Sequence, residues 1–315
     1  MPLRELLKVG DDVLLAEDSF EGLELGLKSL EYLDKLERLP GGSIEQALKV
    51  KTPQGEPLGI AFKNRHPEGD FWLLLPCPHA AAPRKLLAAR AARVLAAGVP
   101  ASTRTRKVAA EQLWKAIRAY MSICLAERAL CDCDKELEPL SFAKNDERGR
   151  RIKGLLDSLA GRHGYRLGQL DALEICCGNG MSTVPLRALF RSVLSVDNDK
   201  CALCNGLHHG TLEPEQTMLA DARALSRHGL GGFDAVLGFM LGTIYEFNKA
   251  EWRTIFTQSY NALRSGGFLL FTVRTQEEMG FVSDAFASMG VKGEVIDNRQ
   301  NDSIYDSWAF FTVKE

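Results

Sequence analysis

Carboxylates and glycines recur where apolar runs end in the second half of the chain. The first of these runs carries Glu174 and leads into a turn that contains Gly178 and Gly180, Asp197 closes the second run, and Asp221 follows the third. Glycines let a backbone approach a ligand closely, and a helix start presents free N–H groups beside such a turn. Carboxylates at these places can accept ribose hydroxyls or an exocyclic amine, but they would repel phosphates. The set predicts a site for a nucleoside with a cationic tail and no phosphates.

The elements that must position these residues alternate between strand and helix from about residue 147 onward. The expected strands are 172–176, 193–196, 217–220, 233–239, 268–273, 291–296 and 307–313, and the expected helices are 147–162, one after 181, one from 200, 250–263 and 277–289. Such alternation predicts an α/β fold with a doubly wound, seven-stranded, mostly parallel sheet covered on both faces. No helix separates the last two runs, so the last strand is expected to be antiparallel.

The first half of the chain has a different pattern, which predicts a smaller α+β domain over residues 1–145, ahead of a second domain over residues 146–315. Leucines between 23 and 36 recur at helical spacing. Strand-like runs at 44–52, 58–63 and 71–75 are separated by turn-forming residues and indicate an antiparallel meander. Two alanine-rich helices are expected at 83–97 and 103–130. The role of this domain, acceptor access or partner binding, stays open.

The motifs of the second half, in their order along the chain, resemble those of the class I S-adenosylmethionine-dependent methyltransferase family. The segment 174–180 is similar to that family's first motif, Val196-Asp197 to its second-strand acid, and Ala220-Asp221-Ala222 to its third motif. Segments 233–236 and 263–267 resemble the fourth strand and the turn before the fifth. The resemblance implies a Rossmann-like domain with S-adenosyl-L-methionine as cofactor. It implies these cofactor-binding residues: Glu174, Cys176, Gly178, Asn179, Gly180, Asp197, Asn198, Asp221, Ala222 and Phe239.

One residue departs from the family pattern, because Cys176 stands where the first glycine of the motif is usual. A cysteine can replace that glycine if its φ angle stays negative. A nicotinamide dinucleotide site is the nearest enzymatic alternative. Against it, Thr183 stands where the third glycine of that motif belongs, and Glu174 would face a pyrophosphate. A Rossmann-like fold without a ligand is the structural alternative.

The methyl acceptor is harder to infer, because methyl transfer depends mainly on alignment of the reactants. The loop after the fourth strand holds Tyr245 and Glu246, which are candidates to orient or deprotonate an acceptor. The loop lacks the Asn/Asp-Pro-Pro-aromatic run of exocyclic-amine methylation, and it has no cysteine nucleophile. We expect a small molecule or a protein side chain as acceptor. The alternatives are an RNA methyltransferase and a non-catalytic cofactor-binding interaction protein.

Basic residues concentrate between 84 and 118, whereas the formal net charge of the whole chain is −2. Placed on one long helix, Arg104, Lys107, Lys115 and Arg118 would share a face that could contact RNA or a protein. A solvated helix face is the simpler interpretation.

Cysteine and histidine also occur close together on the helix after the second strand. Cys201, Cys204 and His208 follow a helical spacing that could bind a metal, and Cys131-Asp132-Cys133 adds two thiols. Buried thiols are the alternative, and we assign no metal.

Composition places the chain among ordinary globular proteins, with 45% hydrophobic and 25% charged residues. No apolar run approaches the roughly 20 residues that span a bilayer, and the charged start is unlike a secretory signal. Eight cysteines are too few for a disulfide scaffold. A cytoplasmic protein without a membrane partner is therefore expected.

Overall fold

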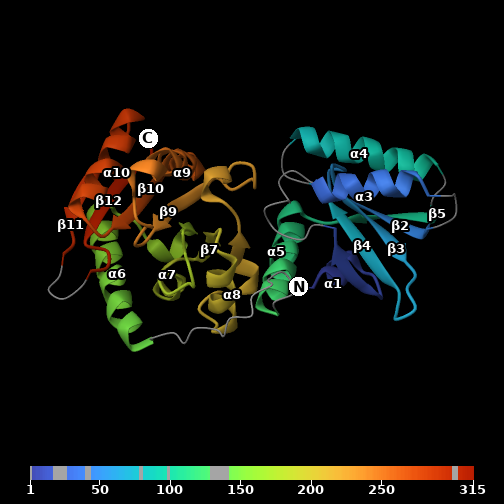
Figure 1. Ribbon diagram of the computed structural model, residues 1–315, viewed down its shortest axis with the longest axis horizontal. Helices are drawn as coiled ribbons and strands as arrows, with labels where there is room; N and C mark the ends of the chain where they lie inside the picture. Colours follow the sequence, from blue (N-terminus) through green and yellow to red (C-terminus); the bar gives the residue numbers. More distant parts are fainter. Residues whose placement is uncertain are drawn as a thin grey trace. The chain divides into compact units, whose positions relative to one another are not determined.

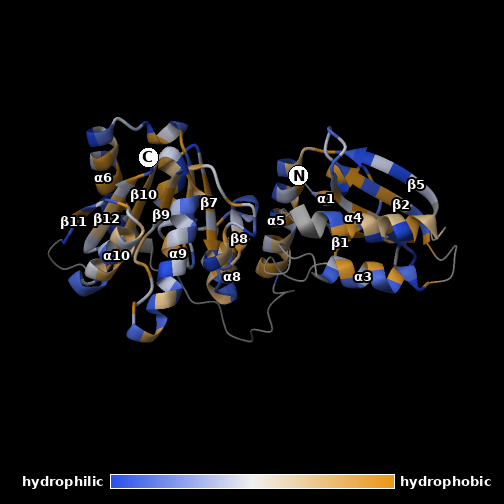
Figure 2. Cartoon of the chain, turned by 90° about the horizontal axis from the view of Figure 1, so that it is seen from above, coloured by the Kyte–Doolittle hydropathy of each residue, from blue (hydrophilic) through white to orange (hydrophobic). Residues whose placement is uncertain are grey.

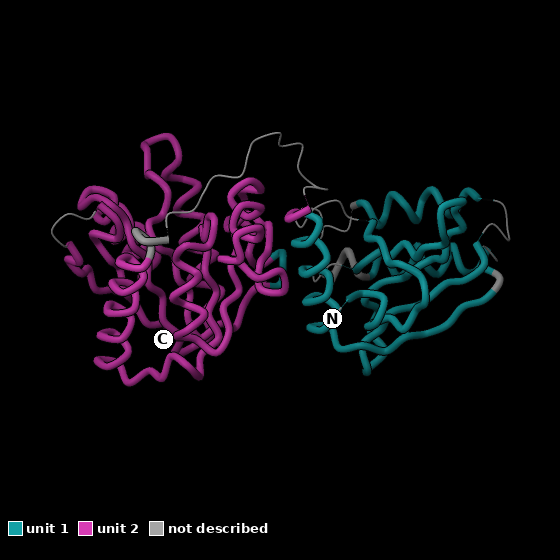
Figure 3. The backbone as a smooth tube through the Cα atoms, turned by 90° about the horizontal axis from the view of Figure 1, so that it is seen from below, with its two compact units in different colours: residues 1–124, 227–229 teal, residues 125–226, 230–315 magenta. Residues whose placement is uncertain are grey.

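The computed structural model describes residues 2–16, 27–39, 44–77, 81–97, 100–127, 142–299 and 304–315. The chain divides into two compact units (Figure 3). Unit 1 comprises residues 1–124 and 227–229, and unit 2 comprises residues 125–226 and 230–315. The division falls about twenty residues before the expected boundary, and residues 128–141 near that boundary lie outside the described part. No helix in the described part of the chain is both long and apolar enough to cross a membrane.

Unit 2 is built on a seven-stranded sheet with the strand order β11-β12-β10-β9-β6-β7-β8 (Figure 1). Its strands are β6 (Asp171–Ile175), β7 (Ser192–Asp197), β8 (Thr217–Leu219), β9 (Phe233–Gly238), β10 (Leu263–Val273), β11 (Glu294–Asp297) and β12 (Trp308–Val313). The pairs β10–β9, β9–β6, β6–β7 and β7–β8 are parallel, whereas β12 runs antiparallel to both β10 and β11. The predicted α/β fold with an antiparallel last strand is confirmed.

Helices cover both faces of this sheet. They are α6 (Phe142–His163), α7 (Thr183–Leu189), α8 (Lys200–His208), α9 (Lys249–Ala262) and α10 (Gln276–Ser288). Alternation along β10 explains how one strand serves two cores. Phe268 belongs to the core beneath α6 and α7, while Phe271 packs against Phe256 of α9 with 5.6 Å between ring centroids. Asp199 caps α8 by accepting from two backbone amides, and Thr275 begins α10 in a capping box.

Unit 1 contains a five-stranded sheet with the order β1-β4-β3-β2-β5. The strands are β1 (Asp12–Leu15), β2 (Ile44–Lys51), β3 (Pro57–Asn64), β4 (Phe71–Pro76) and β5 (Pro100–Lys107). The antiparallel meander β2-β3-β4 is confirmed, and β1 and β5 extend it at its two edges by parallel pairing. The described helices of this unit are α1 (Leu3–Leu7), α3 (Leu27–Glu37), α4 (Ala81–Ala96) and α5 (Ala110–Ala126). Helices α3 and α4 lie on one face of the sheet (Figure 1).

The expected helix over 103–130 is wrong in its first part, because residues 100–107 form strand β5 and the helix begins at Ala110. Residues 102–105 are exposed, so this edge strand lacks the alternation of apolar and polar residues that marks a half-buried strand. Arg104 and Lys107 therefore lie on a strand and cannot share a helix face with Lys115 and Arg118. The expected helical leucines before residue 27 lie outside the described residues.

Candidate functional site

The turn after β6 has the tight backbone expected of a ligand-binding loop, and both its glycines and Cys176 adopt positive φ angles. Gly178 and Gly180 have φ angles of +55° and +78°. A Cβ on Gly180 would lie 2.6 Å from the Leu212 side chain, so packing as well as conformation requires a glycine there. The condition for a cysteine at position 176, a negative φ, is not met, because the φ of Cys176 is +53°. A non-glycine residue in this region stores about 1–2 kcal/mol, which the surrounding contacts must offset.

Glu174 does not line the cavity beside this turn, because its side chain is fully buried. Its carboxylate accepts hydrogen bonds from the hydroxyls of Ser182 at 2.6 Å, Thr183 at 2.5 Å and Ser195 at 2.9 Å. Burial raises the pKa of Glu174, and the three hydroxyl donors and the positive charge of Arg148 oppose that rise. Glu174 thus ties strand β6 to the start of α7 and to β7. The hydroxyl residues at 182, 183 and 195 are the sequence signal for this arrangement.

Asp197 lies at the end of β7 and holds the glycine turn from the other side. One carboxylate oxygen accepts from the amide of Gly178 at 2.8 Å, and the other accepts from the amide of Asp199 at 2.9 Å. Burial raises the pKa of this carboxyl group, and the amide donors counteract the rise. Because the Gly178 amide already donates to a carboxylate, it is not free to cradle a phosphate.

Asp221 follows β8 and is engaged by Arg223, two residues further along. Its carboxylate accepts from the Arg223 amide at 2.7 Å and from the Arg223 Nε at 2.7 Å. The same guanidinium lies 3.4 Å from a carboxylate oxygen of Glu251, on α9. Arg223 therefore bridges acidic groups from two walls of the site.

These elements enclose a cavity of about 480 Å³ at the carboxyl ends of β6, β7, β8 and β9, where ligands bind in doubly wound sheets. The predicted site residues that line it are Cys176, Asp197, Asn198, Asp221 and Ala222. Sequence reasoning missed the lining residues Asp199, Arg223, Met240, Gly242, Asn248, Glu251, Trp252 and Ile255. Burial raises the pKa of the Cys176 thiol, and the neighbouring carboxylates raise it further.

The other predicted cofactor residues lie away from the cavity wall. Gly178, Asn179 and Gly180 belong to the turn behind it, and Phe239 is packed in the core beneath α6 and α7. The charge of the lining is unbalanced: Asp197, Asp199, Asp221 and Glu251 face a single arginine among the lining residues that the structure describes. Such a surface attracts cations and accepts hydrogen bonds from hydroxyl and amino groups.

The predicted catalytic candidates Tyr245 and Glu246 are on the surface, outside the cavity lining. The Tyr245 ring stacks on Phe247 with 5.3 Å between centroids, and the Glu246 carboxylate pairs with Lys249. The backbone amide of Tyr245 donates a hydrogen bond to Asn248 Oδ1 at 2.8 Å, at the start of a short turn. In this structure neither side chain is placed to touch a group bound in the cavity.

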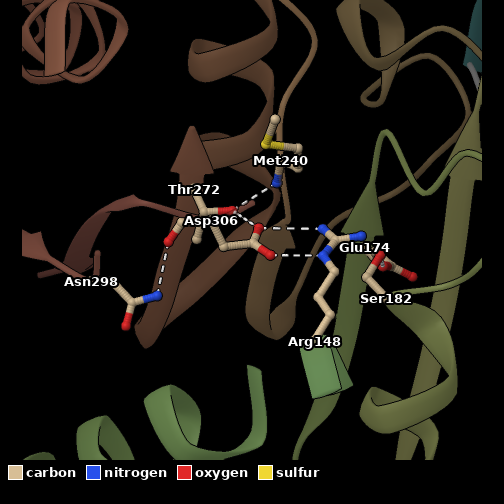
Figure 4. A network of polar contacts seen from close by, with 7 residues as sticks. All are labelled: Arg148, Glu174, Ser182, Met240, Thr272, Asn298 and Asp306. Carbon is tan, nitrogen blue, oxygen red and sulfur yellow. Dashed lines mark hydrogen bonds and ion pairs between the residues drawn. The ribbon is translucent and has the colours of Figure 1, made fainter. Parts of the chain in front are cut away.

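A buried polar network reaches the cavity from behind (Figure 4). Thr272, on β10, accepts a hydrogen bond from the amide of Met240 at 2.7 Å and donates to Asp306 at 2.5 Å. Arg148, on α6, forms two hydrogen bonds to the same aspartate, at 2.7 Å and 3.3 Å. Met240 lines the cavity and has a φ of +55°, so this network holds a strained residue of the wall.

The metal alternative gains no geometric support within the residues that the structure describes. There, no three His, Cys, Asp or Glu side chains are grouped so that they could hold an ion. Cys201 is exposed and Cys204 is buried on α8. Cys131 and Cys133 lie outside the described residues.

Comparison with known proteins gives matches only among solved structures. No family model matches the chain, and no curated protein matches it. The solved structures include an amino pentose methyltransferase from Micromonospora echinaspora (CalS10), which is 15% identical with a TM-score of 0.43 over 57% of this chain and 100% of that chain. Magnesium protoporphyrin IX methyltransferase from Synechocystis PCC 6803 is 15% identical with a TM-score of 0.42, over 64% and 97%. The N-methyltransferase NodS from Bradyrhizobium japonicum is 18% identical with a TM-score of 0.40, over 54% and 97%. These values are too low to carry a function to this chain.

Proposed function

We propose that unit 2 is an S-adenosyl-L-methionine-dependent methyltransferase. The main observation in support is the acidic cavity at the carboxyl ends of the parallel strands, which is bounded by the turn after β6. A ligand that fits it combines ribose hydroxyls, an exocyclic amine and positive charge, and it carries no phosphate. Asp197 would accept the ribose hydroxyls and Asp221 the adenine amine, while the methionine part would lie beside Cys176.

The nicotinamide dinucleotide alternative is weakened by a different residue from the one that the sequence suggested. Glu174 is buried among hydroxyls, so its charge does not face a ligand. Instead, the Asp197 carboxylate takes the amide of Gly178, which a pyrophosphate would need. Thr183, in the place of the third glycine, donates its hydroxyl to Glu174. The turn is therefore used internally rather than offered to phosphates.

The chemistry requires alignment more than acid–base groups, since the sulfonium cofactor supplies an activated methyl group for in-line displacement. Orientation alone can supply about 7–11 kcal/mol of a barrier. The residues of this chain would contribute by holding the nucleoside between Asp197 and Asp221 and by fixing Met240 through Thr272. Carboxylates in the lining favour a cationic ligand over its neutral product.

For the acceptor, we favour a small molecule or a protein side chain. The RNA alternative depended on a basic helix face, which does not form because Arg104 and Lys107 belong to β5. A non-catalytic cofactor-binding protein is the other alternative, and the cavity supports binding in both cases. Turnover separates the two: formation of S-adenosylhomocysteine on addition of candidate acceptors favours the enzyme.

Calorimetric titration of the full chain with S-adenosylmethionine and S-adenosylhomocysteine tests the proposal. Wild-type protein should bind both, and the Asp197→Ala change should weaken binding by about 2–3 kcal/mol, roughly 30- to 150-fold. Asp157→Ala is the matched control, because Asp157 lies on the exposed face of α6, paired with Lys153. Folded wild-type protein that binds neither compound would overturn the proposal.

A further inference from the structure

Unit 1 contains a groove of about 280 Å³ between α4 and the strands β2 and β3. Its lining is mostly apolar and consists of Lys49, Val50, Lys51, Pro57, Gly59, Ile60, Leu87, Ala88, Ala91, Ala92 and Leu95. In Figure 2, α4 lies along the sheet that carries β2 and β5. All lining residues belong to unit 1, so the groove is a property of this unit alone.

The groove lies directly beside the core between α4 and the sheet. Leu87 and Ala91 of α4 are packed in the same core as Ala47 and Ile60. Next to that core, the helix presents Ala88 and Ala92 to the groove. Ala92 is exposed although it lines the groove, so the space is open to solvent.

Lysines follow the same face of the sheet directly beside this apolar lining. Side chains alternate along a strand, so Lys49 and Lys51 lie on the face of Ala47, which points toward α4. In the parallel pairing of β2 with β5, Lys51 is opposite Lys107, which places a third lysine on that face.

These lysines differ from other basic residues of the unit in their partners. Lys63 is held between Asp11 at 3.1 Å and Asp70 at 3.0 Å, and Arg90 pairs with Asp34 at 2.9 Å. Within the described residues, Lys49, Lys51 and Lys107 have no ion pair. Their charges are available to an anion from solution.

We propose that this groove binds a small amphipathic anion, with a short acyl or aryl body in the apolar groove and a carboxylate or phosphate head at Lys49 and Lys51. Pockets for small molecules combine an apolar lining with a few placed polar groups, as here. A nucleic acid backbone fits less well, because its sugars and phosphates would leave the apolar surface of Ala88, Ala92 and Leu95 without a partner. The inference is independent of the function proposed for unit 2.

Titration of the full chain with octanoate, octyl phosphate and octanol tests both halves of the proposal. Octanoate or octyl phosphate should saturate the protein below about 1 mM, and octanol should bind about five- to tenfold more weakly, since two exposed ion pairs contribute modestly. Whichever of octanoate and octyl phosphate binds more tightly identifies the preferred head group. Acetate and inorganic phosphate, which lack the apolar body, should not saturate the protein in this range.

Two pairs of variants locate the binding. Ala92→Leu fills the groove from an exposed position and should reduce octanoate affinity at least about tenfold, whereas Ala89→Leu, also exposed on α4 but outside the lining, should not. Lys49→Gln with Lys51→Gln should remove the preference for octanoate over octanol. Lys85→Gln should keep it, because Lys85 is exposed on α4 outside the groove lining. Near-ultraviolet circular dichroism checks that each variant is folded.

Two outcomes would overturn the proposal. One is the absence of saturable anion binding by folded wild-type protein. The other is binding of polyuridine that the lysine changes abolish and Ala92→Leu leaves intact, which would assign the surface to nucleic acid.

Discussion

The cavity of unit 2 and the groove of unit 1 both lie beside a sheet, yet they carry opposite charge. The cavity lies where parallel strands end, so the end of β7, the segment after β8 and helix α9 bring Asp197, Asp221 and Glu251 to one place. The groove runs along the flank of a sheet, where Lys49 and Lys51 of β2 bring positive charge to its lining. Because the charged lining is mainly acidic in the cavity and basic in the groove, the two spaces should select cationic and anionic ligands respectively.

If the two sites are separate, the largest effect on stability and cofactor binding is expected at Glu174, which supports the cavity and is far from the groove in the sequence. Glu174→Ala should leave three buried hydroxyls without their acceptor and lower the unfolding free energy of unit 2 by about 3–5 kcal/mol. S-adenosylmethionine binding should be lost, while octanoate binding in the groove should remain. Chemical denaturation measures the change in stability, and separate titrations of the folded variant with both ligands measure the change in binding.

Glu174→Gln is the control, because the amide keeps the shape and one acceptor oxygen. It should lie between wild type and Glu174→Ala in stability. If Glu174→Ala lost affinity for S-adenosylmethionine and for octanoate to the same extent, the separation of the two sites would be contradicted.

A smaller effect is expected at Thr272, which holds the cavity wall through Met240. Thr272→Val removes the acceptor of the Met240 amide and the donor to Asp306, so S-adenosylmethionine should bind about tenfold more weakly. Thr272→Ser keeps the hydroxyl and should retain most of the affinity. Calorimetric titration of both variants with S-adenosylmethionine gives the ratio of their dissociation constants to that of the wild type.

Thr312→Val is a matched control for a general loss of stability. Thr312 lies on the neighbouring strand β12, is buried, and donates to the carbonyl of Lys292 at 2.6 Å, away from the cavity. Its loss should lower stability to a similar degree and leave affinity unchanged. If both valine variants bind equally weakly, Thr272 does not position the wall.

The smallest predicted effect is a pH dependence with opposite signs for binding and for stability. Because burial raises the pKa of Asp197 above its ordinary value of 3.8, the folded protein takes up this proton at a higher pH than the unfolded chain. The contribution of Asp197 to stability should therefore decrease as pH rises through the folded pKa. Affinity for the cationic cofactor should increase over the same range, because the carboxylate becomes charged.

Titrations and denaturation curves across this range, with Asp197→Asn as control, separate the two trends. The asparagine variant should lose the part of both trends that is due to Asp197. Affinity that falls as pH rises in the wild type would contradict the role of Asp197 in holding a cationic ligand.

The sequence by itself determined the fold of unit 2 and the strand ends beside which its cavity lies. Alternating strand and helix patterns predicted the sheet, and Asp197 and Asp221 at strand ends predicted the cavity edge. These signals are local, because each depends on residues next to one another in the chain. In unit 1, strand-like runs separated by turn-forming residues identified the meander β2-β3-β4. The same reasoning missed β5, whose exposed Thr and Arg residues do not form such a run.

Tertiary structure decided what each charged group faces. Glu174 and Asp197 look equivalent as acids at the ends of apolar runs, yet one is enclosed by hydroxyls and the other faces the cavity. Arg223, Glu251 and Met240 enter the site only because distant segments converge there. The pairing of β2 with β5 likewise brings Lys51 and Lys107 together across more than fifty residues of sequence. Such contacts depend on the packing of whole elements, which local residue patterns do not encode.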